Sequence, residues 1–320
     1  MVFKLKGNDV IKEQDIEVTE SLIGIYGYNN SGKTTILKEL DKVIDEENIK
    51  CIVNDGRYIR SLFIPTNRVI VRQAHTSSTP IKDIEEFLAY KKDSYNEFDL
   101  HLKVIRENML GNSAVKQVIK NAILYMFGED YEFDFDRRQS DGVENIINIY
   151  CSIIWLFTWD KDIEDIKYDK LKQLLCDTSA VVMIDEIEAF LHVYVQSRML
   201  QKFKEDFSKC SFVFTTHSPL LLSRYYNIRK FQLDNGILNE INADLYYKDL
   251  DNIYEVYFNV VEFPKEAGEI INRLGDYICG EEYNRDVIVK DLEILNEQYA
   301  NIKAKYPGLV AKAEVKLGVE

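Results

Sequence analysis

Three groups of polar residues in this sequence have types and spacing that could act on a phosphate. The first is the run Gly27-Tyr-Asn-Asn-Ser-Gly-Lys-Thr-Thr35, which fits the pattern G-x-x-x-x-G-K-[ST]. The second is the pair Asp185-Glu186, and the third is His217 within Thr-Thr-His-Ser-Pro. Each group follows a short apolar run, so we expect all three at the ends of buried strands.

The glycine-rich run predicts a phosphate-binding loop, or P-loop. Gly27 and Gly32 permit backbone angles at which successive amides can point at one anion. The helix expected near Lys33 adds a partial positive charge of about half an elementary charge. In such loops the lysine reaches the β- and γ-phosphates, and the Thr34 hydroxyl ligates Mg²⁺. The predicted nucleotide-binding residues are Gly27, Asn29, Asn30, Ser31, Gly32, Lys33, Thr34 and Thr35.

The acid pair and the histidine have the chemistry for hydrolysis. Asp185 is predicted to hold Mg²⁺ through its water shell, together with Thr34. Glu186 points elsewhere and is predicted to accept a proton from the attacking water. An imidazole at a strand end, His217, could donate to the γ-phosphate or orient the water. The predicted catalytic residues are therefore Lys33, Glu186 and His217.

Apolar patterns predict the elements that must position these groups. We expect buried strands at 22–26, 180–184 and 211–215, and an extended segment at 61–72. Helical patterns cover 33–44, 83–127 with a break at Gly111-Asn112, and the segment from 140 to 159 that follows a polar turn. A further helix follows the acid pair and ends near 207. Residues 231–238 predict a hairpin with an Asn-Gly turn.

The order of the motifs resembles that of the ABC-type ATPases. In that family a signature turn with Ser and Gly starts a helix upstream of the acid pair, and Ser140-Asp-Gly142 occupies this place. The resemblance implies that Ser140 and Gly142 bind the γ-phosphate held by a second subunit. The motifs themselves are similar to those of the OLD-like group, often labelled AAA15 or AAA-family ATPases. The likeness extends over roughly residues 1–235 and includes Ile64-Pro-Thr-Asn-Arg68.

The resemblance implies an α/β fold of the P-loop NTPase type, with a mixed central sheet flanked by helices and a helical lobe inserted at about 76–177. It assigns residues 1–235 to an ABC-type ATPase domain. Residues 236–320 then form a C-terminal extension with a β-hairpin remnant and helices. A glutamine that would follow the strand after the P-loop helix is not obvious in the sequence, and Gln73 is one candidate.

As a function, the resemblance implies Mg²⁺-dependent ATP binding and hydrolysis that drive a homodimer, or higher oligomer, to close head to tail. It further implies control of a protein effector encoded nearby, in defence against phage. Two alternatives stay open: a DNA repair or recombination ATPase similar to RecF or a short-armed Rad50, and the nucleotide-binding subunit of a transporter.

Composition limits these choices. The 320 residues include 40 basic and 54 acidic ones, a net charge of −14, so DNA contact is possible but not indicated by charge. No apolar run approaches the 20 residues that a membrane span needs. The five cysteines include no CxxC pair, which favours a reducing compartment, and we expect a cytoplasmic protein.

A seam of apolar residues near the end follows a heptad spacing, which allows packing either within the chain or on a partner. Its members are Ile288, Leu292, Leu295, Tyr299, Ile302 and Tyr306.

Overall fold

The computed structural model describes residues 1–18, 22–53, 59–66, 102–223, 227–241, 265–280, 283–299 and 307–318. The chain divides into two compact units, Met1–Tyr247 and Lys248–Glu320. Each unit has its own apolar core, and the two are described separately.

The first unit is built on a six-stranded sheet with the strand order β4-β5-β6-β3-β7-β8. The first five strands in this order are parallel, and β8 pairs antiparallel with β7. Every residue of β3 and β5 is buried, as expected for inner strands covered on both faces. The α/β class with a mixed sheet is confirmed. The strands are β3 (Leu22–Tyr26), β4 (Ser61–Ile64), β5 (Ala180–Ile184), β6 (Cys210–Thr216), β7 (Arg229–Asp234) and β8 (Ile237–Glu240).

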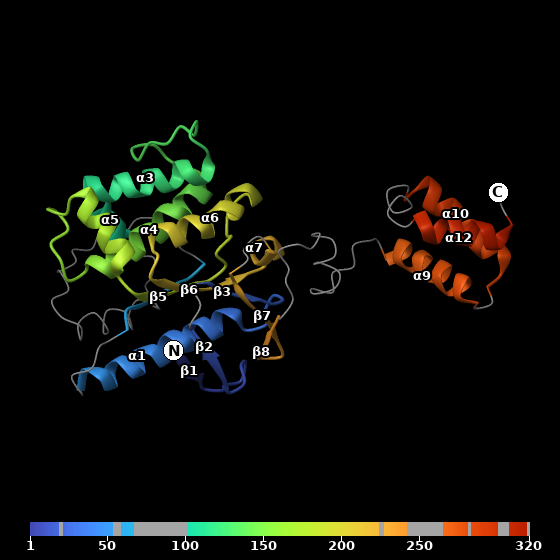
Figure 1. The fold of residues 1–320 in the computed structure, drawn as a ribbon, viewed down its shortest axis with the longest axis horizontal. Helices are drawn as coiled ribbons and strands as arrows, with labels where there is room; N and C mark the ends of the chain where they lie inside the picture. Colours follow the sequence, from blue (N-terminus) through green and yellow to red (C-terminus); the bar gives the residue numbers. More distant parts are fainter. Residues whose placement is uncertain are drawn as a thin grey trace. The chain divides into compact units, whose positions relative to one another are not determined.

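Helices cover both faces of this sheet (Figure 1). On one face lie α1 (Lys33–Val53) and a small antiparallel hairpin of β1 (Val2–Leu5) and β2 (Gln14–Glu17). The apolar stripe predicted for α1 is buried against the sheet at Ile36, Leu37, Leu40 and Ile44. On the other face lie α3 (Ser113–Phe127), α4 (Asp141–Thr158), α5 (Tyr168–Asp177) and α6 (Val193–Asp206), and the short α7 (Pro219–Ser223) follows β6.

The helix α1 is longer than its apolar pattern predicts, because a polar contact holds its second half. The side chain of Asn48, which is 2% exposed, donates to the Ile59 carbonyl at 2.8 Å and accepts from the Ile59 amide at 2.6 Å. This pair of hydrogen bonds ties the helix to the segment that enters β4. A pattern search for apolar residues alone therefore ends the helix too early, at residue 44.

The apolar segment before Trp159 forms α4, a helix buried inside the unit. On this helix, Tyr150 contacts Phe203 of α6. Tyr150 and Phe157 both contact Phe207, which follows α6 directly. The predicted break before α3 is also present. The side chain of Asn112 caps α3 by accepting hydrogen bonds from two backbone amides in its first turn. The helical pattern expected at 83–101 lies outside the described residues. No helix in the described part of the chain is long and apolar enough to span a membrane.

The predicted hairpin with an Asn-Gly turn is confirmed as β7 and β8. Asn235 and Gly236 both have positive φ, at 48° and 76°, which matches the two-residue turns that join antiparallel strands. A Cβ on Gly236 would lie 2.5 Å from the Val10 carbonyl oxygen, so the β1–β2 loop approaches this turn closely. The domain boundary drawn at residue 235 from the sequence falls inside this hairpin, whereas both strands belong to one sheet.

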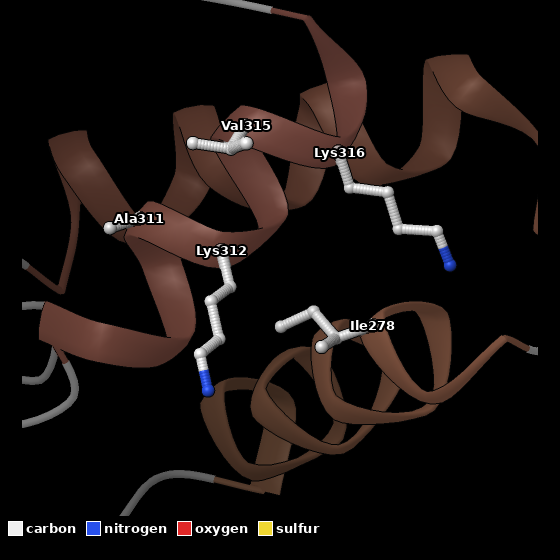
Figure 2. Close-up of a pocket in the computed structure, with 5 residues that line it drawn as sticks. All are labelled: Ile278, Ala311, Lys312, Val315 and Lys316. Atoms are coloured by element: carbon white, nitrogen blue, oxygen red, sulfur yellow. The ribbon is translucent and has the colours of Figure 1, made fainter.

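The second unit contains α9 (Lys265–Cys279), α10 (Arg285–Glu297) and α12 (Pro307–Leu317). Three members of the predicted heptad seam, Ile288, Leu292 and Leu295, are buried in its core, so this stretch of the seam packs within its own unit. The positions at 302 and 306 lie outside the described residues. On the surface, a shallow groove between α9 and α12 is lined by Ile278, Ala311, Lys312, Val315 and Lys316 (Figure 2).

Candidate functional site

The P-loop connects β3, a central strand of the sheet, to α1. Asn30 and Gly32 have positive φ, at 63° and 98°, which turns the loop back on itself before Lys33 begins the helix. A Cβ on Gly27 would lie 2.5 Å from Ser31 Oγ and 3.1 Å from the Leu233 carbonyl oxygen, so the loop packs closely around this glycine. Ser31 Oγ is buried and has no hydrogen-bond partner among the described residues.

The side chain of Lys33, the predicted phosphate-binding lysine, folds back into the P-loop. Its side chain is 7% exposed, and Nζ donates to the carbonyls of Gly27 at 2.9 Å and Tyr28 at 3.0 Å. Burial lowers the pKa of Lys33, and the carboxylates of Asp185 and Glu186 act in the opposite direction. The loop thus holds an ammonium group that an incoming phosphate could draw away from neutral carbonyls.

Asp185 follows β5 directly and is held by threonine hydroxyls. It is 4% exposed. Its Oδ2 accepts from Thr34 Oγ1 at 2.7 Å and from Thr66 Oγ1 at 3.0 Å, while its Oδ1 accepts from Thr215 Oγ1 at 2.6 Å. The two residues predicted to hold a metal, Thr34 and Asp185, are therefore in direct contact although 151 positions separate them.

Glu186 and His217 face each other beside this carboxylate. Glu186 has a φ of 45°, and its amide donates to Thr215 Oγ1 at 2.7 Å. Its Oε1 lies 3.8 Å from His217 Nε2, and the two side chains are 40% and 35% exposed. This separation is longer than a hydrogen bond. Both groups are accessible to water and to a ligand, as a base and a phosphate-contacting imidazole must be.

A tight turn at 186–191 links this pair to the rest of the site. Glu188 Oε1 accepts from the His217 amide at 2.5 Å. Gln196 of α6 donates to the Leu191 carbonyl at 2.9 Å and accepts from Ser218 Oγ at 2.8 Å. Glu188 in the turn thus holds the backbone amide of His217, and Gln196 of α6 holds the side chain of Ser218. These contacts connect the segment that carries the predicted imidazole to the segment that carries the predicted base.

The same turn contacts the start of α4, where the predicted signature residues lie. Asn145 Nδ2 donates to the Ala189 carbonyl at 2.7 Å. A Cβ on Gly142 would lie 2.6 Å from the Phe190 carbonyl oxygen, so Gly142 packs directly on this turn. Ser140 is the N-cap residue of α4, but its hydroxyl makes no capping hydrogen bond and the residue is exposed.

The N-terminus of α4 carries the partial positive charge of a helix start. Its first turn carries two acidic residues, Asp141 and Glu144, and Glu144 is paired with Arg106. The structure thus brings Gly142 against the turn at 186–191 and leaves Ser140 on the surface. An anion reaching Ser140 would have to approach from outside this unit.

The residues present fit a nucleotide and a divalent cation. Ser31 Oγ is buried without a hydrogen-bond partner in the part of the chain that the structure describes, and together with the ammonium group of Lys33 it suits a phosphate. The oxygen donors at Thr34 and Asp185 are the type that Mg²⁺ prefers. Glu186 borders the same cluster through the hydroxyl of Thr215, and His217 lies beside Glu186.

Sequence reasoning missed several residues that hold this site together. Thr66 and Thr215 bind Asp185, while Glu188 and Gln196 hold the segment after β6. A signal for the threonines does exist, because both are hydroxyl residues at the end of an apolar strand, beside the predicted acid. Gln196 gives no such signal, since it lies within an amphipathic helix. Gln73, the candidate raised from the sequence, lies outside the described residues.

Comparisons with known proteins agree with this site. Residues 171–223, which include Asp185, Glu186 and His217, match the family described as "AAA domain, putative AbiEii toxin, Type IV TA system". The chain is 23% identical over 210 residues to a protein of Escherichia coli named "Retron Ec83 probable ATPase". That alignment covers 54% of this chain and 38% of the relative, so the chain matches well under half of the relative's length.

Solved structures of ATP-binding cassettes are similar at low identity. One is a dimeric cassette bound to ADP and phosphate after hydrolysis, with a TM-score of 0.37, 13% identity, and coverage of 75% of this chain and 98% of that chain. Another is a metal-chelate-type ABC transporter in an inward-facing conformation, with a TM-score of 0.39, 14% identity, and coverage of 81% and 88%. The family match and the relative confirm the resemblance to AAA-family ATPases.

Proposed function

We propose that this chain binds Mg–ATP at the P-loop, closes head to tail on a second copy, and hydrolyses the bound ATP. One observation carries the proposal: the P-loop, the acid pair and His217 lie at the ends of β3, β5 and β6, which are neighbours in the sheet. The contact between Thr34 and Asp185 joins the loop to the acids within a single chain.

In the proposed reaction, the P-loop amides and Lys33 bind the β- and γ-phosphates and neutralise their charge. Mg²⁺, held by Thr34 and Asp185, would further neutralise the charge that develops on the phosphate oxygens. Glu186 takes a proton from water while the water oxygen attacks the γ-phosphorus. The bond from that phosphorus to the β–γ bridging oxygen breaks, giving ADP and phosphate. Because the step needs positioning and charge neutralisation, the enzyme needs no covalent intermediate.

His217 has a second task in this proposal. Its imidazole lies on the Glu186 side of the cluster, so it can hold the attacking water or a γ-phosphate oxygen. Glu188 accepts from its backbone amide, and Gln196 accepts from the hydroxyl of the next residue, Ser218. We further propose that hydrolysis is slow and that bound ATP keeps two copies together. Ser140 and Gly142 of a second copy then complete the site.

The decisive test is Glu186→Gln. We expect nucleotide binding within about threefold of the parent, because the amide keeps the shape of the side chain. Turnover should fall by roughly 100-fold to 10,000-fold, the usual range for loss of a general base. With ATP and Mg²⁺, the variant should elute as a dimer in size-exclusion chromatography, since bound ATP is no longer consumed.

The matched control is Glu205→Gln, the same chemical change on the exposed face of α6. It should leave both turnover and elution unchanged. If Glu186→Gln hydrolyses ATP at the parental rate, or stays monomeric with ATP bound, the assignment of the base or of the closed dimer is wrong.

The output of the switch is proposed to be an effector protein in a defence system, in the cytoplasm. Two findings support this: the relative named for a retron and the family description that mentions a toxin. Pull-down with the product of the neighbouring gene, using Glu186→Gln with ATP and with ADP, tests it. Capture that depends on ATP supports an effector. Equal capture in both states, or none, contradicts ATP-dependent control.

A further inference from the structure

Strand pairing places Thr66 beside Asp185, at the end of the sheet that also carries the P-loop. The strands β4 and β5 are parallel, with Ile64 opposite Ile184, so the residues after each strand emerge side by side. The Asp185 amide continues this pairing by donating to the Ile64 carbonyl at 2.9 Å. Thr66 follows β4 by two positions, and its Oγ1 donates to Asp185 Oδ2 at 3.0 Å.

Two hydroxyls share this one carboxylate oxygen. Thr34 Oγ1, from the start of α1, donates to the same Oδ2 at 2.7 Å. The other oxygen, Oδ1, accepts from Thr215 Oγ1 at 2.6 Å, and Thr215 Oγ1 also accepts from the Glu186 amide. Asp185 is therefore anchored on its Oδ1 side. Its Oδ2 side presents three oxygen atoms from three separate elements in one cluster.

We propose that Thr66 is a third protein residue of the divalent-cation site, alongside Thr34 and Asp185; this inference rests on the proposed function. A hydroxyl has two acceptor lone pairs besides its proton, so Thr66 can turn its oxygen toward an ion or toward one of the ion's waters. Mg²⁺ takes six oxygen ligands in an octahedron and keeps several waters among them. A further hydroxyl can therefore serve as one of these ligands or bind one of the waters. Thr66 is half-buried beside Asp185, where its hydroxyl can contact the water molecules around the ion.

A role limited to orienting Asp185 is less consistent with the contacts. Thr215 already fixes the carboxylate through Oδ1, and the backbone of Asp185 is fixed by β4. Thr34 and Thr66 occupy the same side of Asp185, and the pattern G-x-x-x-x-G-K-[ST] assigns the first of these hydroxyls to the ion. Because Thr66 donates to the same oxygen, Asp185 Oδ2, it can reach the same ion as Thr34.

The test is the Mg²⁺ dependence of nucleotide binding, measured by titration calorimetry with a non-hydrolysable ATP analogue. Thr66→Val removes the hydroxyl and keeps the shape. We expect the Mg²⁺ concentration at half-saturation to rise about tenfold, the size usual for partners of metal ligands. Binding of the analogue in excess chelator should stay within twofold. Thr66→Ser should restore the parental Mg²⁺ dependence.

Two further variants keep the test decisive. Thr66→Ala should show the same shift as Thr66→Val, so a folding defect of the valine variant does not end the experiment. Thr178→Val removes another half-buried hydroxyl, which bonds to the Leu174 carbonyl at the end of α5, and should leave Mg²⁺ dependence unchanged.

Three outcomes separate the ideas. If the parent protein shows no Mg²⁺-dependent nucleotide binding, the proposed function fails. If the parent shows it and folded Thr66→Val and Thr66→Ala match the parent, only the role of Thr66 is wrong. Equal losses with and without Mg²⁺ would also overturn that role, because they place Thr66 in general nucleotide binding.

Discussion

The two parts of the proposed nucleotide site differ in how completely one chain builds them. At the sheet edge, Asp185 is 4% exposed and three threonine hydroxyls hold it. At the start of α4, Ser140 is exposed and its hydroxyl makes no capping hydrogen bond. The first part is preassembled by hydrogen bonds within one chain, whereas the second presents a helix N-terminus to the surroundings.

The difference indicates which part of the site contributes to nucleotide binding by one copy and which part contributes only when a second copy is present. Groups that are fixed in advance lose little entropy on binding, so the sheet edge suits tight nucleotide binding by one copy. A helix start on the surface adds its interaction only when a second body brings an anion to it. The turn at 186–191 contacts both parts, through Glu188 on one side and Gly142 on the other. We propose that this turn transmits closure of the dimer to Glu186 and His217.

The largest effect is expected at the preassembled part. Lys33→Ala should weaken ATP binding by roughly 100-fold, because several charge-assisted hydrogen bonds to phosphate are lost. Fluorescence titration with a labelled nucleotide measures it. Lys38→Ala, on the exposed side of the same helix, is the control and should bind normally. Tight ATP binding by Lys33→Ala would show that the P-loop is not the nucleotide site.

A smaller effect is expected where the two parts touch. Gly142→Ala places a Cβ against the Phe190 carbonyl, and the turn must shift. We expect a loss of about 1–3 kcal/mol in the free energy of unfolding and about tenfold slower turnover, with ATP binding within threefold. Thermal unfolding and steady-state hydrolysis measure these quantities.

The control for this variant is Gly111→Ala, whose Cβ would meet nothing within 4 Å. It should match the parent in both measurements. Unchanged turnover in folded Gly142→Ala would contradict a link between α4 and the acid pair.

The smallest effect is expected at the exposed part. In the Glu186→Gln background, Ser140→Ala should weaken ATP-dependent dimerisation by about threefold to tenfold, the value of one hydrogen bond. ATP binding by the monomer should not change. Analytical ultracentrifugation measures the dimer, and Ser113→Ala at the exposed start of α3 is the control. A dimer of parental strength in Ser140→Ala would remove Ser140 from the interface.

Much of the site was accessible from local sequence. The P-loop, the strand before it and the helix after it follow from glycines, an apolar run and helical spacing within about 25 residues. The Asn-Gly hairpin and the Asn112 cap are equally local. These features depend on backbone angles and hydrogen bonds between near neighbours, which residue types alone can set.

The roles of Thr66, Thr215 and Gln196 could not be predicted in this way. Their contacts depend on β4 pairing with β5, β5 with β6, and α6 packing beside the segment after β6. The spacing of the heptad seam was compatible with packing within the chain or on a partner. Ile288, Leu292 and Leu295 are buried in the core of the second unit, so this stretch packs within the chain.

Residue types and their spacing along one loop were enough to predict which residues bind a phosphate, because that chemistry is local. The hydroxyls that surround Asp185 and the turn that holds His217 become visible in the folded chain. Strand order and the hydrogen bonds between strands depend on the whole buried core. Residues more than 100 positions apart become neighbours only when that core forms.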